Sequence, residues 1–242
     1  MKTVSLVIPA FNEEQRLPET LRVLKLYAEM NLTDWTVQEV LIVDDGSTDQ
    51  TKSVIESWHR QWPCVRGLGY QTNRGKGAAI RRGLLETGAE WILIADADMA
   101  TPWEELQRFS AYTDQYDLIM GSRALPESDI QVRQHWLRQS MGKIFNKILR
   151  RVTGLPFRDT QCGFKLLRND SIFREKVLPE LKIDRFAWDV ELIWRMILIN
   201  KRVCEVPIRW LHREASRVRL LVDSLEMLLS LLKLRTKLRK KA

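Results

Sequence analysis

The chain of 242 residues is long enough for one ordinary domain with a sizeable core, and its 45% hydrophobic and 29% charged residues exclude an intrinsically disordered protein. Its three cysteines lie far apart without a C-x-x-C pair, which excludes a disulfide framework and a cysteine zinc site. The net charge of +8 is concentrated in residues 213–242, where nine Lys or Arg stand against three acids.

The first half of the sequence alternates strand and helix patterns. We predict strands at 4–8, 40–43, 65–70, 91–95 and 118–120, and helices at 14–30, from about 49 onward, and at 75–85. Pro9 is expected to stop the first strand, and Asn12 to cap the helix that follows it. Alternation at this spacing predicts an α/β fold with a mostly parallel sheet and helices on both faces.

The second half is more helical. Apolar residues repeat at helical spacing over 137–152, a segment that also carries many Lys and Arg. A break at 154–156 leads to residues 159–164, and we expect a helix at 189–200 and a short strand at 203–207. No internal repeat is found, so we predict one catalytic domain at 1–212 and a basic helical tail at 213–242.

Two aspartates, Asp96 and Asp98, end the fourth predicted strand. Strand geometry sends residues i and i+2 to one side, so their charges repel unless a cation or a ligand compensates them. Mg²⁺ or Mn²⁺, held by these carboxylates together with substrate phosphates, answers that need. The alternative is a strand-end turn with solvated acids.

Other polar segments follow neighbouring strands. Asp45 follows the second strand, and its carboxylate is a candidate acceptor for a base imide or a ribose hydroxyl; the alternative is a helix-capping acid. Residues 9–13 follow the first strand and can wall the same crevice, because ligands bind beyond the carboxyl ends of parallel strands. Residues 73–77 open a helix, so their backbone N–H groups and Lys76 are candidates to meet phosphate, although the Walker spacing is absent.

These segments together resemble glycosyltransferase family 2, inverting enzymes with the GT-A nucleotide-diphospho-sugar transferase fold. The matching pieces are Pro9–Glu13, Val43–Ser47, Gly75–Gly77 and Asp96–Asp98. The resemblance implies a nucleotide-sugar donor, with a Mg²⁺ or Mn²⁺ ion held by Asp96 and Asp98. It implies donor contacts from Pro9, Ala10, Phe11, Glu13, Val43, Asp45, Lys76, Asp96 and Ala97.

Later segments resemble one branch of that family, the polyprenyl-phosphate glycosyltransferases, and in particular its dolichyl-phosphate β-glucosyltransferases. These segments are Gly121–Arg123, Asp159–Lys165, Phe186–Leu192 and Ser216–Arg219. The resemblance implies that Arg123, Arg138 and Ser140 meet the phosphate of a polyprenyl or dolichyl acceptor. It makes Asp98, Arg123, Asp159 and Asp189 the candidate catalytic residues, the last two with helix or loop capping as the alternative.

The implied reaction is in-line attack of the acceptor phosphate on the anomeric carbon of a hexose, with glucose from UDP-glucose as the donor suggested by the resemblance. The alternatives are GDP-mannose as donor, or a family 2 enzyme that glycosylates a sugar hydroxyl of a glycan or polysaccharide. A nucleic-acid-binding module would also explain the basic charge, but no recognised nucleic-acid motif is present. A catalytically silent scaffold does not explain the intact acidic motifs.

The C-terminal segment is predicted to be an amphipathic helix. Its polar stripe is Arg219, Asp223, Glu226, Ser230, Lys233 and Lys237, and its apolar positions are Leu221, Leu225, Leu228 and Leu232. Such a helix can lie in a membrane interface, pack on the domain or pack on a second subunit. Because neither a signal peptide nor a long apolar stretch is seen, we expect a cytoplasmic protein, peripheral at the cytoplasmic face of a membrane.

Overall fold

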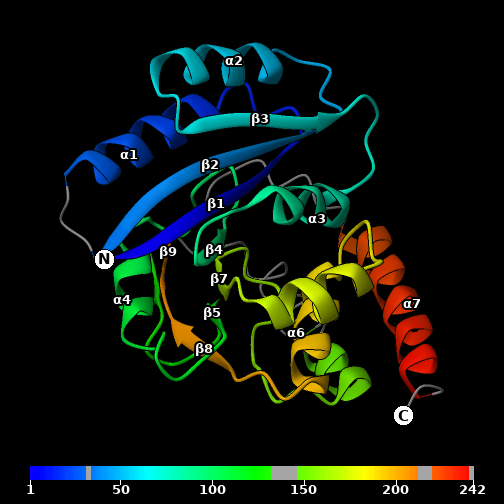
Figure 1. The fold of residues 1–242 in the computed structure, drawn as a ribbon. Coiled ribbons are helices and arrows are strands. Elements are labelled where there is room, and N and C mark those ends of the chain that lie inside the picture. The colour runs from blue at the N-terminus through cyan, green and yellow to red at the C-terminus, as the bar shows by residue number, and fades with distance from the viewer. Residues whose placement is uncertain (31–33, 132–145, 212–219, 240–242) are drawn as a thin grey trace.

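The computed structural model describes residues 1–30, 34–131, 146–211 and 220–239. Its elements, drawn in Figure 1, run in the following order along the chain: β1 Lys2–Ala10, α1 Leu17–Glu29, β2 Trp35–Asp45, α2 Thr51–Gln61, β3 Val65–Tyr70, α3 Lys76–Glu86, β4 Trp91–Ile94, α4 Glu105–Ser110, β5 Leu118–Ser122, β6 Asp129–Ile130, β7 Lys165–Arg168, η1 Phe173–Val177, η2 Leu178–Glu180, α6 Trp188–Leu198, β8 Val203–Pro207, β9 Arg209–Trp210 and α7 Leu220–Arg239. Residues 146–153 are also helical.

One large sheet forms the centre of the described residues. Its strands lie in the order β3-β2-β1-β4-β7-β5-β8, and all its pairings are parallel except those of β7, which runs antiparallel to β4 and β5. The predicted α/β fold with a mostly parallel sheet is therefore confirmed. The strand β7 was not predicted, because the short run Lys165–Arg168 begins and ends with a charge.

Two hydrophobic cores cover the two faces of this sheet. Leu6 and Ile42 point to the face that packs against α1, α2 and α4, whereas Val7 and Val43 point to the face under α3 and α6. The alternation follows from the strand period of two, which sends successive side chains to opposite faces. Figure 1 shows α1 and α2 on one side of the sheet and α3, α6 and α7 on the other.

Several predicted boundaries differ from the structure, and two of these differences have a clear local reason. The strand β1 continues through Pro9 to Ala10, because β4 pairs only with Val4–Val7 and the missing N–H of Pro9 therefore lies beyond that ladder. The helix α1 begins at Leu17 rather than near Glu14, after a turn in which the backbone N–H of Leu17 donates to the carbonyl of Glu13.

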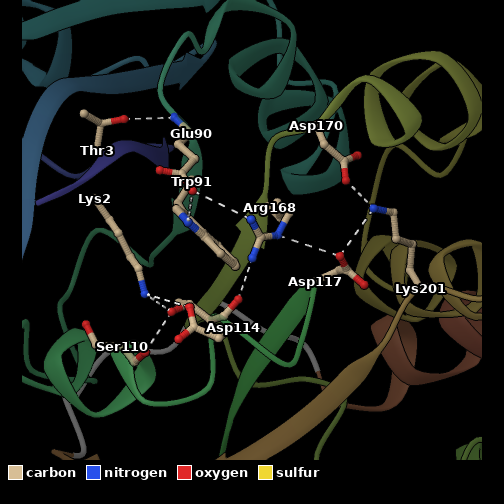
Figure 2. A network of polar contacts seen from close by, with 11 residues as sticks. Lys2, Thr3, Glu90, Trp91, Ser110, Asp114, Asp117, Arg168, Asp170 and Lys201 are labelled. Carbon is tan, nitrogen blue, oxygen red and sulfur yellow. Dashed lines mark hydrogen bonds and ion pairs between the residues drawn. The ribbon is translucent and has the colours of Figure 1, made fainter.

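A network of charges ties the strands together at the end of the sheet where β1 and β4 begin (Figure 2). The guanidinium of Arg168 lies 4.4 Å from the ring centre of Trp91 and reaches Glu90 and Asp117 at 3.7 and 3.8 Å. Lys201 pairs with the same Asp117 and with Asp170. These contacts connect β4, β7, β5 and β8, so this end of the sheet is held by side chains as well as by the ladders.

The C-terminal helix α7 packs on the domain through a face offset from the predicted one. Met227 and Leu231 join the core under α6, while Leu229 and Leu232 are 50% and 42% exposed. The side chain of Glu226 pairs with Arg185 at 3.4 Å. The leucines of this helix extend well beyond its packed face, so helical periodicity alone could not determine which of them face the core. The boundary at 212/213 remains a prediction.

We expect Leu231→Ala to lower the free energy of unfolding by about 2–5 kcal/mol, since the fully buried side chain leaves a cavity. The matched substitution Leu229→Ala, two residues away on the exposed side, should change it by no more than about 0.5 kcal/mol. Urea unfolding followed by circular dichroism gives both values. Equal losses would mean that α7 does not pack on the domain in solution as described.

Candidate active site

The candidate site lies where β1, β2 and β4 end. These three strands are parallel neighbours, so the residues that follow them meet at one edge of the sheet. The acidic residues Asp45 and Asp96 come from this edge. A fourth segment, the loop 159–164, reaches the same place because β7 runs antiparallel between β4 and β5.

The paired aspartates occupy a tight turn after β4. The carboxylate of Asp96 accepts a hydrogen bond from the ammonium of Lys76 at 2.5 Å, and Oδ1 of Asp98 accepts one from the backbone N–H of Ala100 at 3.0 Å. Met99, with a φ of 47°, closes the turn, and its N–H donates to the carbonyl of Asp96. Both aspartates are partly exposed, as a ligand site requires.

The two carboxyl groups are electrostatically unequal. Burial raises the pKa of Asp98, and the neighbouring charge of Asp96 raises it further. Burial also acts to raise the pKa of Asp96, but the ammonium groups of Lys76 and Lys165 outweigh it and hold that pKa below its ordinary value. A cation between the two carboxylates would relieve the cost of ionising Asp98.

Gly163 lies directly against the carboxylate of Asp96. A Cβ atom at Gly163 would stand 2.1 Å from Oδ2 of Asp96, a distance that no side chain can tolerate. The backbone of the loop 159–164 is therefore in close contact with the carboxylate of Asp96. Only glycine allows this approach.

Asp45 organises the loop that carries Lys76. It is 3% exposed, and its two carboxylate oxygens accept hydrogen bonds from the backbone N–H groups of Arg74 and Gly75, each at 2.8 Å. Burial raises the pKa of Asp45 despite these two hydrogen bonds. The predicted nucleoside contact of Asp45 remains a prediction, and the structure adds a second role for the same carboxylate.

The segment after β1 is tied to the segment after β2. Asn12, with a φ of 55°, donates from its backbone N–H to Oγ of Ser47 at 2.8 Å and accepts at Oδ1 from the N–H of Thr48 at 2.7 Å. The N–H of Glu13 donates to Oγ1 of Thr51 at 2.7 Å. The predicted donor-binding residues Pro9, Ala10, Phe11, Glu13, Val43, Asp45, Lys76, Asp96 and Ala97 all lie at or beside this edge. The Val43 side chain is fully buried under α3, so a ligand could meet only its backbone.

Arg123, whose side chain is 33% exposed, forms an ion pair with the buried carboxylate of Asp159. Nε and Nη2 of Arg123 donate to the two oxygens of Asp159 at 2.7 and 3.0 Å, and the backbone N–H of Arg123 adds a third hydrogen bond at 3.0 Å. Burial alone would raise the pKa of Asp159, but the guanidinium of Arg123 holds it below its ordinary value. A carboxylate held in this way is a weak proton acceptor, and the pair leaves Nη1 as the guanidinium nitrogen that can meet a ligand.

Asp189 lies in the first turn of α6, after Ala187 with its φ of 75°. Its Oδ1 accepts hydrogen bonds from Nε2 of Gln161 and from the N–H of Val190, both at 2.8 Å. Burial raises the pKa of Asp189. Among the predicted catalytic residues, Asp189 is therefore better suited than Asp159 to take up a proton. Arg138 and Ser140, predicted to meet the acceptor phosphate, lie outside the described residues.

Sequence reasoning missed Lys165. Its side chain is fully buried, and its charge acts on Asp96, Asp159 and Asp189. A lysine that precedes Leu166 and Leu167 is itself a signal, because a charge within a buried run needs nearby partners.

Known proteins resemble this chain in both sequence and fold. The sequence profile of glycosyl transferase family 2 matches residues 5–173. The chain is 31% identical to a dolichyl-phosphate beta-glucosyltransferase of Dictyostelium discoideum, over 96% of this chain and 73% of that protein. It is 33% identical to the protein of that name from Mus musculus, over 90% and 70%. Glucosyl-3-phosphoglycerate synthase of Mycobacterium tuberculosis, solved with Mn²⁺, UDP and phosphoglyceric acid, shares the fold with a TM-score of 0.68 at 18% identity, covering 96% of this chain and 78% of that one.

A mostly parallel sheet with a paired-aspartate turn at its carboxyl edge and this set of neighbours defines a glycosyltransferase of the GT-A class. Within that class, the chain belongs to glycosyl transferase family 2.

We expect Gly163→Ala to displace Asp96, because the added methyl group would overlap its carboxylate. Affinity for Mn²⁺, measured by calorimetry, should fall about tenfold or more. Gly88→Ala is the matched control, since its Cβ would meet only Gln38 and Glu39 side-chain atoms at 3.4 and 4.0 Å. A Gly163→Ala protein that binds Mn²⁺ as tightly as the Gly88→Ala protein would contradict the described position of the loop.

Proposed function

We propose that the protein transfers glucose from UDP-glucose to a polyprenyl phosphate of the dolichyl type, with inversion at the anomeric carbon. The observation that carries this proposal is the similarity to proteins named dolichyl-phosphate beta-glucosyltransferase over 90% or more of the chain. It is supported by the meeting of Lys76, Asp96 and Asp98 at the carboxyl edge of the sheet.

A divalent cation, Mg²⁺ or Mn²⁺, belongs to this proposal. Asp96 and Asp98 would hold it, and the oxygen ligands and partial exposure of this turn fit either ion. Among the described residues, no three His, Cys, Asp or Glu side chains gather as a metal site. The remaining ligands would therefore be water and the donor diphosphate, as is usual for Mg²⁺. When bound, the ion supplies charge neutralisation for the leaving diphosphate.

The proposed reaction is a single displacement at the anomeric carbon of the donor sugar. An oxygen of the acceptor phosphate forms a bond to the anomeric carbon as the bond from that carbon to the nucleoside diphosphate breaks on the opposite side. A phosphate monoester, whose second pKa is near 6, is already an anion at neutral pH, so it needs no strong general base. Arg123 presents Nη1 to an anion, while Asp159 fixes its orientation through the other two nitrogens.

The alternative acceptor, a sugar hydroxyl, would need a base. Asp189 is the candidate for that role, because burial raises its pKa and its two hydrogen bonds both use Oδ1. GDP-mannose remains the alternative donor. The assay described below distinguishes both alternatives from the proposed reaction.

The test is transfer from radiolabelled UDP-glucose to a short polyprenyl phosphate in detergent, with Mg²⁺ or Mn²⁺ added. We expect a lipid-linked product that chelation abolishes and that Asp98→Asn reduces at least about a hundredfold. Asp114→Asn, in a side chain that is 89% exposed, is the control and should be as active as the wild type.

Parallel reactions with GDP-mannose, and with oligosaccharides as acceptors, separate the alternatives. Robust transfer to a sugar hydroxyl with no lipid product would replace the polyprenyl phosphate by a glycan. Product formed only from GDP-mannose would replace the donor.

We further propose peripheral contact with the cytoplasmic face of a membrane, where a polyprenyl phosphate resides. Within the described residues, no helix is both long enough and apolar enough to span a bilayer. The helix α7 exposes Leu229 and Leu232 beside Lys233, and residues 146–153 expose Ile148 among Lys147, Arg150 and Arg151. Apolar and basic side chains on one helix are the combination that binds anionic lipid headgroups.

We expect the double substitution Leu229→Ser and Leu232→Ser to reduce co-sedimentation with phosphatidylserine-containing vesicles about tenfold, because each loses buried apolar area in the interface. The matched control is Leu26→Ser with Met30→Ser, an exposed pair at the C-terminal end of α1, which lies on the opposite side of the sheet. If both double variants sediment as the wild type does, α7 is not the lipid-binding surface.

A further inference from the structure

Lys165 is a fully buried lysine inside the sheet, and the reaction described above does not use it. It opens β7, where it pairs with Ile94 of β4 on one side and with Met120 of β5 on the other. Each neighbouring strand leads directly into the site, β4 to Asp96 and β5 to Arg123. Lys165 therefore lies between the two segments that carry the predicted metal-binding and acceptor-binding residues.

The contacts of its ammonium group are specific. Nζ donates a hydrogen bond to the carbonyl of Cys162 and lies 5.3 Å from the ring centre of Trp188. A charge removed from water is costly unless it is paired, so this arrangement needs compensation from nearby groups. Burial acts to raise the pKa of Asp96, Asp159 and Asp189, and the charge of Lys165 acts to lower it in all three.

The hydrogen bond to Cys162 links Lys165 to Asp96 through the backbone. Cys162 is followed by Gly163, whose missing side chain leaves room for the Asp96 carboxylate. The hydrogen bond from Lys165 to the carbonyl of Cys162 therefore fixes the backbone that contacts the Asp96 carboxylate. Among the hydrogen bonds of the described residues, the Asp96 carboxylate accepts one, from the flexible side chain of Lys76.

We propose that Lys165 is a positioning residue for the predicted metal-binding pair. By anchoring the Cys162–Gly163 backbone against Asp96, it fixes the Asp96 carboxylate where a divalent cation can share it with Asp98. This inference rests on the proposed function, because it assumes that the pair binds the cation.

A purely structural role predicts a different result, and Lys201 provides the comparison. The side chain of Lys201 is 10% exposed and pairs with Asp117 and Asp170 in the network of Figure 2, which lies away from the candidate site. Methionine has a shape similar to that of lysine, so either substitution removes an enclosed ammonium group with little other change. Both variants should lower the unfolding temperature, but only Lys165→Met should affect the site.

The experiment is titration with Mn²⁺ alone, with free Mn²⁺ measured by electron paramagnetic resonance, for the full chain, Lys165→Met and Lys201→Met. We expect the Kd for Mn²⁺ to rise about tenfold to a hundredfold in Lys165→Met and to stay unchanged in Lys201→Met. In the transfer assay, kcat of Lys165→Met should fall while KM for the lipid phosphate stays at the wild-type value.

Two results would overturn the inference in distinguishable ways. If the wild type binds Mn²⁺ and folded Lys165→Met binds it equally well, Lys165 only supports the fold, and the proposed function stands. If the wild type itself does not bind Mn²⁺, the cation site of the proposed function fails and this inference fails with it.

A second variant covers the case in which Lys165→Met does not fold. Lys165→Arg keeps the charge, but the larger guanidinium cannot take the place of the ammonium beside Cys162 and Trp188 without moving the backbone. We expect it to fold and to bind Mn²⁺ several-fold more weakly than the wild type. An unchanged Kd in that variant would also overturn the inference.

Discussion

Repulsion between carboxylates is the constraint that the site has to satisfy. Asp45, Asp96, Asp98, Asp159 and Asp189 approach one edge of a sheet, and each has its own compensation. Asp45 accepts hydrogen bonds from two backbone N–H groups, and Asp96 accepts one from the ammonium of Lys76. Asp159 accepts hydrogen bonds from the guanidinium of Arg123, and Asp189 accepts one from the side chain of Gln161. Asp98 accepts one hydrogen bond from a backbone N–H, and burial and the charge of Asp96 raise its pKa, so an added cation would stabilise its ionised form.

The antiparallel strand β7 makes this arrangement possible. A sheet of parallel strands alone would bring to the site only segments that follow strands, such as those after β1, β2, β4 and β5. Because β7 enters between β4 and β5 in the opposite direction, the loop before it lies beside the turns after its neighbours. That reversal places Asp159 against Arg123 and Gly163 against Asp96.

The parts that could be predicted from the sequence are those with a local signal. The runs that became β3 and β4, and the acidic residues at strand ends, follow from composition and the order of motifs. The position of β7 could not be predicted, since a four-residue strand flanked by Lys165 and Arg168 has no clear period and its pairing is set by distant strands. The packed face of α7 could not be predicted either, because its leucines extend well beyond the face that packs on the domain. The roles of the individual site residues remain predictions.

The burial of Asp159 determines how strongly ionic strength acts on its pairing with Arg123. Asp159 is 1% exposed and the side chain of Arg123 is 33% exposed, so dissolved ions screen this partly buried pair less than they screen a fully exposed one. The exposed basic side chains of residues 146–153 face water, and attraction between such charges and an anionic surface weakens within a Debye length of about 8 Å at physiological salt. Rising salt would therefore weaken the proposed contact with a lipid surface before it weakened the pairing of Arg123 with Asp159.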